Sequence, residues 1–121
     1  MTMTAIPSQV QLAEKLYVDG YLLPSGEIRI GIQSASLAAG FKDRYLKNIV
    51  ASPNQYNILK SHGYTGDTLS LSVSYGSLGT TRAETISLDD FHKLIIYGAL
   101  KGKKESIAIM VATSLIGLTN Y

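Results

Sequence analysis

The stretch QSASLAAGFKDRYLKNIVA, residues 33–51, has the pattern of two short helices joined by a tight turn. Ser34 can cap the first helix, because its hydroxyl can accept a hydrogen bond from a backbone N–H two or three residues on. The residues that follow are small or apolar, so this helix can pack closely against a neighbour. Gly40 stands where a helix often ends in the left-handed conformation. The stretch therefore predicts a helix–turn–helix-like unit.

The second helix of this unit gathers polar and basic side chains. They are Lys42, Arg44, Tyr45, Lys47 and Asn48. A basic helix on an apolar support can enter a DNA groove, so we expect these residues to bind DNA, with Arg44 and Asn48 reading bases. Tyr45 would stack or donate to a phosphate, although packing in the core explains it equally well. A helical hairpin with one solvated basic face and no DNA partner is the competing interpretation.

Length and composition are those of one globular domain over residues 1–121, with residues 1–9 expected to be loose. The net charge is only +2, so a basic footprint has to come from local clustering. The chain has no cysteine, which excludes disulfides and thiolate metal sites and fits a reducing cytoplasm. It shows neither a signal peptide nor an apolar run long enough to cross a bilayer. We therefore expect a cytoplasmic protein without a membrane partner.

Period-two alternation predicts short antiparallel strands on both sides of the helical unit. Residues 18–32 have the pattern of a β-hairpin that turns at Pro24-Ser25-Gly26. Residues 69–75, LSLSVSY, alternate strictly between apolar and serine positions, and residues 83–88 supply a second strand, expected antiparallel to the first. Between these pairs, residues 54–60 predict a short helix that stops at Gly63.

Two further helices are expected at the C-terminal end, which makes the fold class α+β. Ser87 is the expected N-cap of the first, with Asp89 and Asp90 at the positive end of the helix dipole. This helix runs to about Leu100 and ends at Gly102. Three lysines cluster at the break and can reach DNA phosphates. They are Lys101, Lys103 and Lys104.

The last helix, from about residue 105, carries more apolar surface than one packed stripe needs. The stripe expected to face the core contains Ile107, Met110, Val111, Leu115 and Leu118. That assignment leaves Ile109, Ala112 and Ile116 on a second face. Such a face predicts a homodimer interface, and packing under the N-terminal arm of the same chain is the alternative.

Catalytic chemistry finds no support in the sequence. His62 and His92 are isolated from any nucleophile, and no set of metal ligands has the necessary spacing. We therefore expect no enzyme activity, no cofactor and no metal.

The second half resembles the closing part of a phage-antirepressor or Bro-N-like domain. The residues that carry the resemblance are 86–97, ISLDDFHKLIIY, followed by 99–108, ALKGKKESIA. In such domains a short strand leads into a helix, a lysine-rich turn and a final helix, and a strand pair and a helix–turn–helix-like unit come earlier. The resemblance covers about residues 17–118. It implies a sequence-specific DNA-binding domain of a phage- or mobile-element-type transcription regulator, often the N-terminal part of a longer protein. The alternative is an oligomerisation or protein-interaction module without a nucleic-acid partner.

Overall fold

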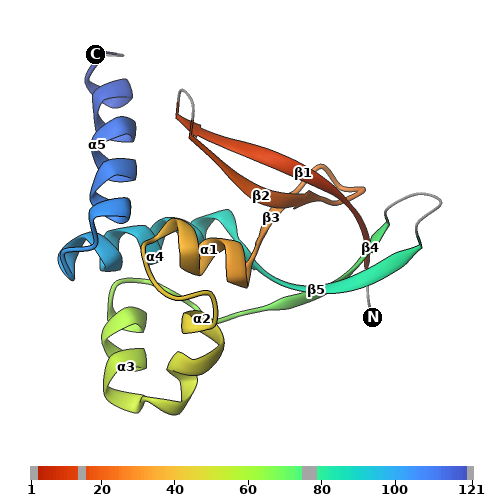
Figure 1. The fold of residues 1–121 in the computed structure, drawn as a ribbon, viewed down its shortest axis with the longest axis horizontal. Helices are drawn as coiled ribbons and strands as arrows, with labels where there is room; N and C mark the ends of the chain where they lie inside the picture. The colour runs from red at the N-terminus through yellow and green to blue at the C-terminus, as the bar shows by residue number, and fades with distance from the viewer. Residues whose placement is uncertain (1–2, 14–15, 75–78, 120–121) are drawn as a thin grey trace.

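A closed sheet forms one part of the molecule in the computed structural model, which describes residues 3–13, 16–74 and 79–119 (Figure 1). The described strands are β1 (Met3–Ala13), β2 (Leu16–Leu22), β3 (Ile28–Gly31), β4 (Leu69–Ser74) and β5 (Thr80–Ser87). They close into a barrel in the order β1-β2-β3-β5-β4. The pairing of β1 with β4 is parallel, and the other pairings are antiparallel.

The predicted strand pairs are confirmed. Strands β2 and β3 form the hairpin, with Leu22 opposite Ile28. Strand β5 runs antiparallel to β4, where Leu71 and Val73 are fully buried. The alternation of apolar residues with serine therefore predicted the buried face of β4 correctly, because one face of that strand packs in the core.

The N-terminal residues are a correction to the prediction. Residues 3–9 belong to β1 and are not a loose lead-in. Ile6 pairs with Leu22 of β2, and Met3 pairs with Leu71 of β4. Residues 6–9 show no apolar alternation of their own, so their strand conformation depends on pairing with β2.

The helix–turn–helix-like unit exists, but its second helix is much shorter than expected. Helix α1 (Ile32–Ala38) leads to Gly40, whose φ of +93° confirms the left-handed turn. Helix α2 (Tyr45–Asn48) has only 4 residues and continues as the 3₁₀ turn η1 (Ile49–Ala51). Gly31, not Ser34, occupies the N-cap of α1, so the predicted capping role of Ser34 is wrong.

The remaining helices lie where the sequence placed them. They are α3 (Pro53–Ser61), α4 (Leu88–Leu100) and α5 (Lys104–Thr119). The Ser87 hydroxyl accepts from the backbone N–H of Asp90 at 3.0 Å, which confirms the predicted cap. The Asp90 carboxylate is itself buried and accepts from the backbone N–H and hydroxyl of Thr65 at 2.9 and 2.7 Å. Asp90 therefore fastens the segment after α3 to the start of α4.

Helix α5 turns a different face to the core than the sequence predicted. Ile109 is only 6% exposed and belongs to the main core, whereas Ile107 and Val111 are 43% and 53% exposed. The expectation that Ile109 lies on a free second face for a dimer is therefore wrong. Ala112 is half-buried, and the side chain of Ile116 lies outside the described part of the structure. None of the helices within the described residues is both long and apolar enough for a membrane span.

The fold is thus α+β, with mixed helices and a mainly antiparallel sheet. Its main core lies between α4 and the surrounding elements, where Leu94 and Ile95 are buried with Ile30 of β3 and Ile86 of β5. Because α1, α2 and α3 all pack against this core, the turn before α2 and the turn after α4 come to line the same hollow.

Candidate nucleic-acid interface

Lysines from two distant segments surround one hollow beside α2. Lys42 precedes α2, and Lys101 and Lys103 follow α4, about 60 residues later in the chain. The other residues of this lysine hollow are Gly40, Phe41, Tyr45 and Gln55. The fold therefore brings together two basic clusters that the sequence could only identify separately.

Aromatic rings form the floor of the lysine hollow. Phe41 stacks on Tyr45 with ring centroids 4.0 Å apart and lies 6.0 Å from the ring of Tyr97. The Lys103 ammonium lies 5.1 Å above the Phe41 ring, and the Lys101 ammonium lies 5.4 Å above the Tyr97 ring. These cation–π contacts hold two lysines in place while leaving their charge unneutralised.

A directed hydrogen-bond chain runs beneath these lysines. Lys101 Nζ and Tyr97 Oη each donate to Gln55 Oε1 at 3.0 Å. A lysine has only donors, so the Gln55 atom that it meets must be the amide oxygen. The Tyr97 hydroxyl therefore uses its only proton in the bond to Gln55. The Tyr45 oxygen lies 3.1 Å from the Tyr97 oxygen, so the Tyr45 hydroxyl has to donate its own proton to the Tyr97 oxygen.

This chain changes the expected role of Tyr45. Its proton points to Tyr97, and its ring stacks on Phe41, so the residue packs in the wall of the hollow. Burial, followed by the hydrogen bond with Tyr97, raises the pKa of the Tyr45 phenol well above its usual range. The neutral hydroxyl therefore has an acceptor lone pair, and no proton, to offer a ligand.

No acidic residue lines the lysine hollow within the described structure. Glu105 lies at its rim beside Gly40, where an added Cβ would approach Glu105 Oε2 to 3.0 Å and Lys103 Cβ to 3.1 Å. The positive φ of Gly40 and this close approach together favour glycine at the turn. Only with that tight turn do Phe41 and Lys42 come next to Lys103.

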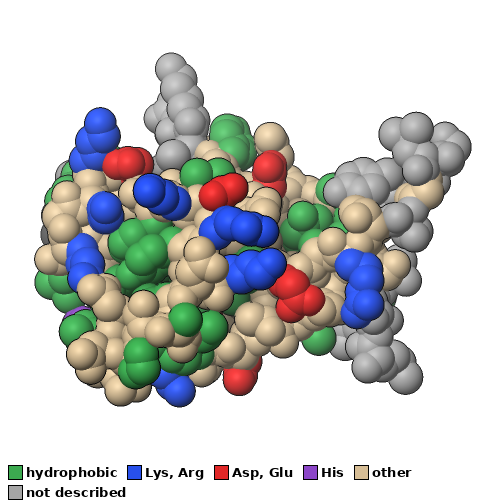
Figure 2. Space-filling model, turned by 60° about the horizontal axis from the view of Figure 1, so that its bottom comes forward, with side chains coloured by type: hydrophobic (Ala, Val, Ile, Leu, Met, Phe, Trp, Pro, Cys, Tyr) green, Lys and Arg blue, Asp and Glu red, His purple; other side chains and the backbone are tan. Residues whose placement is uncertain are grey.

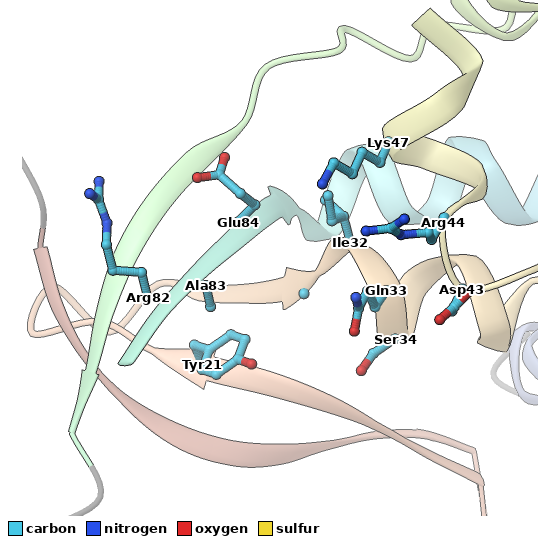
Figure 3. Close-up of a pocket in the computed structure, with 11 residues that line it drawn as sticks. Tyr21, Ile32, Gln33, Ser34, Asp43, Arg44, Lys47, Arg82, Ala83 and Glu84 are labelled. Atoms are coloured by element: carbon cyan, nitrogen blue, oxygen red, sulfur yellow. The ribbon is translucent and has the colours of Figure 1, made fainter. Parts of the chain in front are cut away.

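A second hollow, the sheet–helix groove, lies between the sheet and α1 (Figure 3). Its charged and amide side chains are Gln33, Asp43, Arg44, Lys47, Arg82 and Glu84. The Glu84 carboxylate accepts a hydrogen bond from the Ser70 hydroxyl, which directs it toward β4. Arg44 and Lys47 are exposed, and their charged ends point toward the start of α1.

The structure separates the residues that the sequence assigned to DNA. Lys42, Tyr45, Lys101 and Lys103 line the lysine hollow, and Arg44 and Lys47 line the groove. Asn48 and Lys104 are exposed at the end of α2 and the start of α5 and line neither hollow.

Sequence reasoning missed Gln33, Gln55 and Arg82. Each is a single polar residue outside a charged cluster, so the sequence carries no signal that would single them out.

The face of the molecule in Figure 2 carries many Lys and Arg side chains, with Asp and Glu among them. No family model matches the chain, and neither a curated protein nor a solved structure matches it. Within residues 3–13, 16–74 and 79–119, no three His, Cys, Asp or Glu side chains are placed to hold a metal ion.

Proposed function

We propose that this chain is a DNA-binding domain that holds duplex phosphates on the lysine hollow. Arg44 and Lys47 extend the contact into the neighbouring groove. The observation that carries the proposal is the convergence of Lys42, Lys101 and Lys103 around a hollow with no acidic lining residue among those described. Three lysines around one hollow raise the local positive potential, which favours a polyanion.

The way in which these lysines are held supports a phosphate partner. Lys101 and Lys103 lie on aromatic rings, and no carboxylate within the described structure forms an ion pair with them. A cation–π contact leaves the ammonium charge unneutralised, so these lysines remain able to bind a phosphate. The resemblance to antirepressor-type domains agrees with this reading and extends it to a transcription regulator of a phage or mobile element.

The length of α2 limits how bases are read. A helix of 4 residues cannot lie along a major groove as a recognition helix does, so phosphate contacts dominate the proposed interface. Asn48 stands exposed at the end of α2, where it remains the candidate base reader in this proposal.

A charge-reversal comparison tests the proposal. Lys103→Glu and Lys60→Glu change the net charge equally, but Lys60 lies on α3 beside Tyr56 and lines neither hollow. Fluorescence anisotropy with a random duplex at low salt should show at least a tenfold loss for Lys103→Glu and a much smaller loss for Lys60→Glu. Equal losses would mean that only net charge matters, and the lysine hollow would then have no part in binding.

The second candidate function is self-association through α5. It is favoured by the exposure of Ile107 and Val111, which lie one turn apart on the same side of that helix. The occupant proposed for this face is a second copy of the chain, since a two-fold contact would cover the same two side chains in both copies. A homodimer would also double the phosphate-binding surface.

A further inference from the structure

The sheet–helix groove combines three features: cationic side chains without a partner in the described structure, small side chains and an aromatic ring (Figure 3). We propose that this groove binds a nucleoside phosphate, with the phosphate held by Arg44, Lys47 and Gln33 and the base beside Tyr21. The proposal goes beyond duplex binding at the lysine hollow and does not depend on it.

The cationic end of the groove is free to bind an anion. The side chains of Arg44 and Lys47 make no hydrogen bond or ion pair with any residue that the structure describes. Arg29 shows the contrast, because its guanidinium is buried and bonded to Thr85 and Glu27. In Figure 3 the Lys47 ammonium and the Arg44 guanidinium point into the space above Gln33. A phosphate there would receive charge-assisted hydrogen bonds from two cations and one from the amide.

The middle of the groove is left open by small side chains. Gly31 and Ala83 both line the groove, and neither has a side chain that extends beyond Cβ. The Tyr21 ring packs close to Gly31, because a Cβ added there would lie 3.4 Å from a ring carbon. Because Gly31 and Ala83 are small, the groove leaves room for a base next to the ring, as on the aromatic platforms of nucleic-acid-binding proteins.

The acids of the groove do not oppose this arrangement. Glu84 is directed toward Ser70 on β4. Asp43 lies beside Ser34 at the edge of the groove, where a carboxylate accepts hydrogen bonds from a sugar hydroxyl or a base amino group. The hollow has a volume of about 540 Å3, within the usual range of small-ligand pockets.

Two sources supply this chemistry: a free nucleotide, or one nucleotide of an unpaired strand. Isothermal titration calorimetry with the four nucleoside 5′-monophosphates tests the first. Anisotropy with a labelled single strand of eight mixed nucleotides tests the second. Binding in the first arm assigns a free ligand, and binding in the second arm alone assigns a strand. Inorganic phosphate is the control for the base, and it should bind at least tenfold more weakly than the nucleotide.

One variant fills the groove, and a second removes an amide and a positive charge from it. Gly31→Val places a branched side chain on the floor without backbone strain, because φ at Gly31 is −61°. The double variant Gln33→Ala with Arg44→Ala changes only exposed side chains, so it keeps the test valid if Gly31→Val fails to fold. Each should weaken binding at least tenfold, while Lys60→Ala, on α3 and outside both hollows, should leave it unchanged. The proposal is overturned if neither probe binds, if phosphate binds as tightly as the nucleotide, or if the double variant binds like the parent. Duplex binding measured on the Lys103 variants reports separately on the lysine hollow.

Discussion

Ser106 in α5 donates a hydrogen bond from its hydroxyl to the carbonyl oxygen of Ala39 at the end of α1, at 2.6 Å. Both residues are fully buried. This bond satisfies a carbonyl that the end of the helix leaves without an intrahelical partner. It also fixes the start of α5 against the Gly40 turn. The lysine hollow depends on this junction, because Lys103 and Phe41 flank it on either side.

Gly98→Ala should destabilise the junction severely. A Cβ at this position would lie 2.1 Å from Ser106 Oγ and 2.9 Å from Ser106 Cβ, so α4 and α5 would have to separate. We expect a loss of about 2 kcal/mol or more in the free energy of unfolding, measured by urea denaturation. Adding Ser106→Gly should recover part of that loss. Strictly additive effects of the two substitutions would contradict the proposed contact.

Tyr97→Phe should cost more stability than Tyr45→Phe. The first removes both the donor to Gln55 and the acceptor of the Tyr45 proton, whereas the second leaves the Tyr97–Gln55 bond intact. We expect about 1–2 kcal/mol for Tyr97→Phe and less than about 1 kcal/mol for Tyr45→Phe. Because the Tyr45 proton is committed to Tyr97, Tyr45→Phe should not weaken duplex binding in anisotropy. A tenfold loss would show instead that this hydroxyl donates to a phosphate.

Stability should fall in alkali as buried tyrosines ionise. Burial, with smaller contributions from Asp90 and Tyr56, raises the pKa of Tyr64, and burial also raises that of Tyr45. In the unfolded chain both phenols lose their protons near pH 10. The stabilisation that comes from keeping these phenols protonated is therefore complete below about pH 10. It is lost as the pH rises toward the pKa values of the folded protein.

Thermal melts between pH 8 and 11 can measure this loss. Tyr64→Phe should make it smaller, and Tyr17→Phe should not, since Tyr17 is exposed. If Tyr64→Phe leaves the pH dependence of the melting temperature unchanged, the Tyr64 phenol ionises at the same pH in the folded and the unfolded chain.

The two sides of α5 should respond differently to truncation. Ile109→Ala opens a cavity in the core and should cost about 2–4 kcal/mol, whereas Val111→Ala should cost less than about 1 kcal/mol. Chemical denaturation of the two variants measures the difference. If α5 also joins two copies, Ile107→Glu with Val111→Glu should give a folded monomer in sedimentation velocity. A parent chain that is already monomeric at high concentration would exclude the dimer.

Sequence patterns predicted those helices and strands whose position depends on residues close by in the chain. The Leu71 and Val73 alternation defined β4, and the Ser87 hydroxyl defined the start of α4, because each depends on neighbours within a few residues. The burial of Ile109 was not predictable, because α5 is apolar on both sides and only its docking against α4 and β1 selects one. The role of Tyr45 depends on Tyr97, 52 residues later, so no spacing within the turn reveals it.

The salt dependence of duplex binding is the sharpest test of the lysine hollow as a phosphate-binding surface. Five cations, three in the lysine hollow and two in the groove, predict a slope of log affinity against log salt of about −4.5. Replacing Lys42, Lys101 and Lys103 together with alanine should reduce the slope to about −2, with the fold intact by circular dichroism. Fluorescence anisotropy between about 50 and 200 mM salt should show that change in slope. A parent chain that does not bind duplex DNA at the lowest salt, or a triple variant with an unchanged slope, would contradict it.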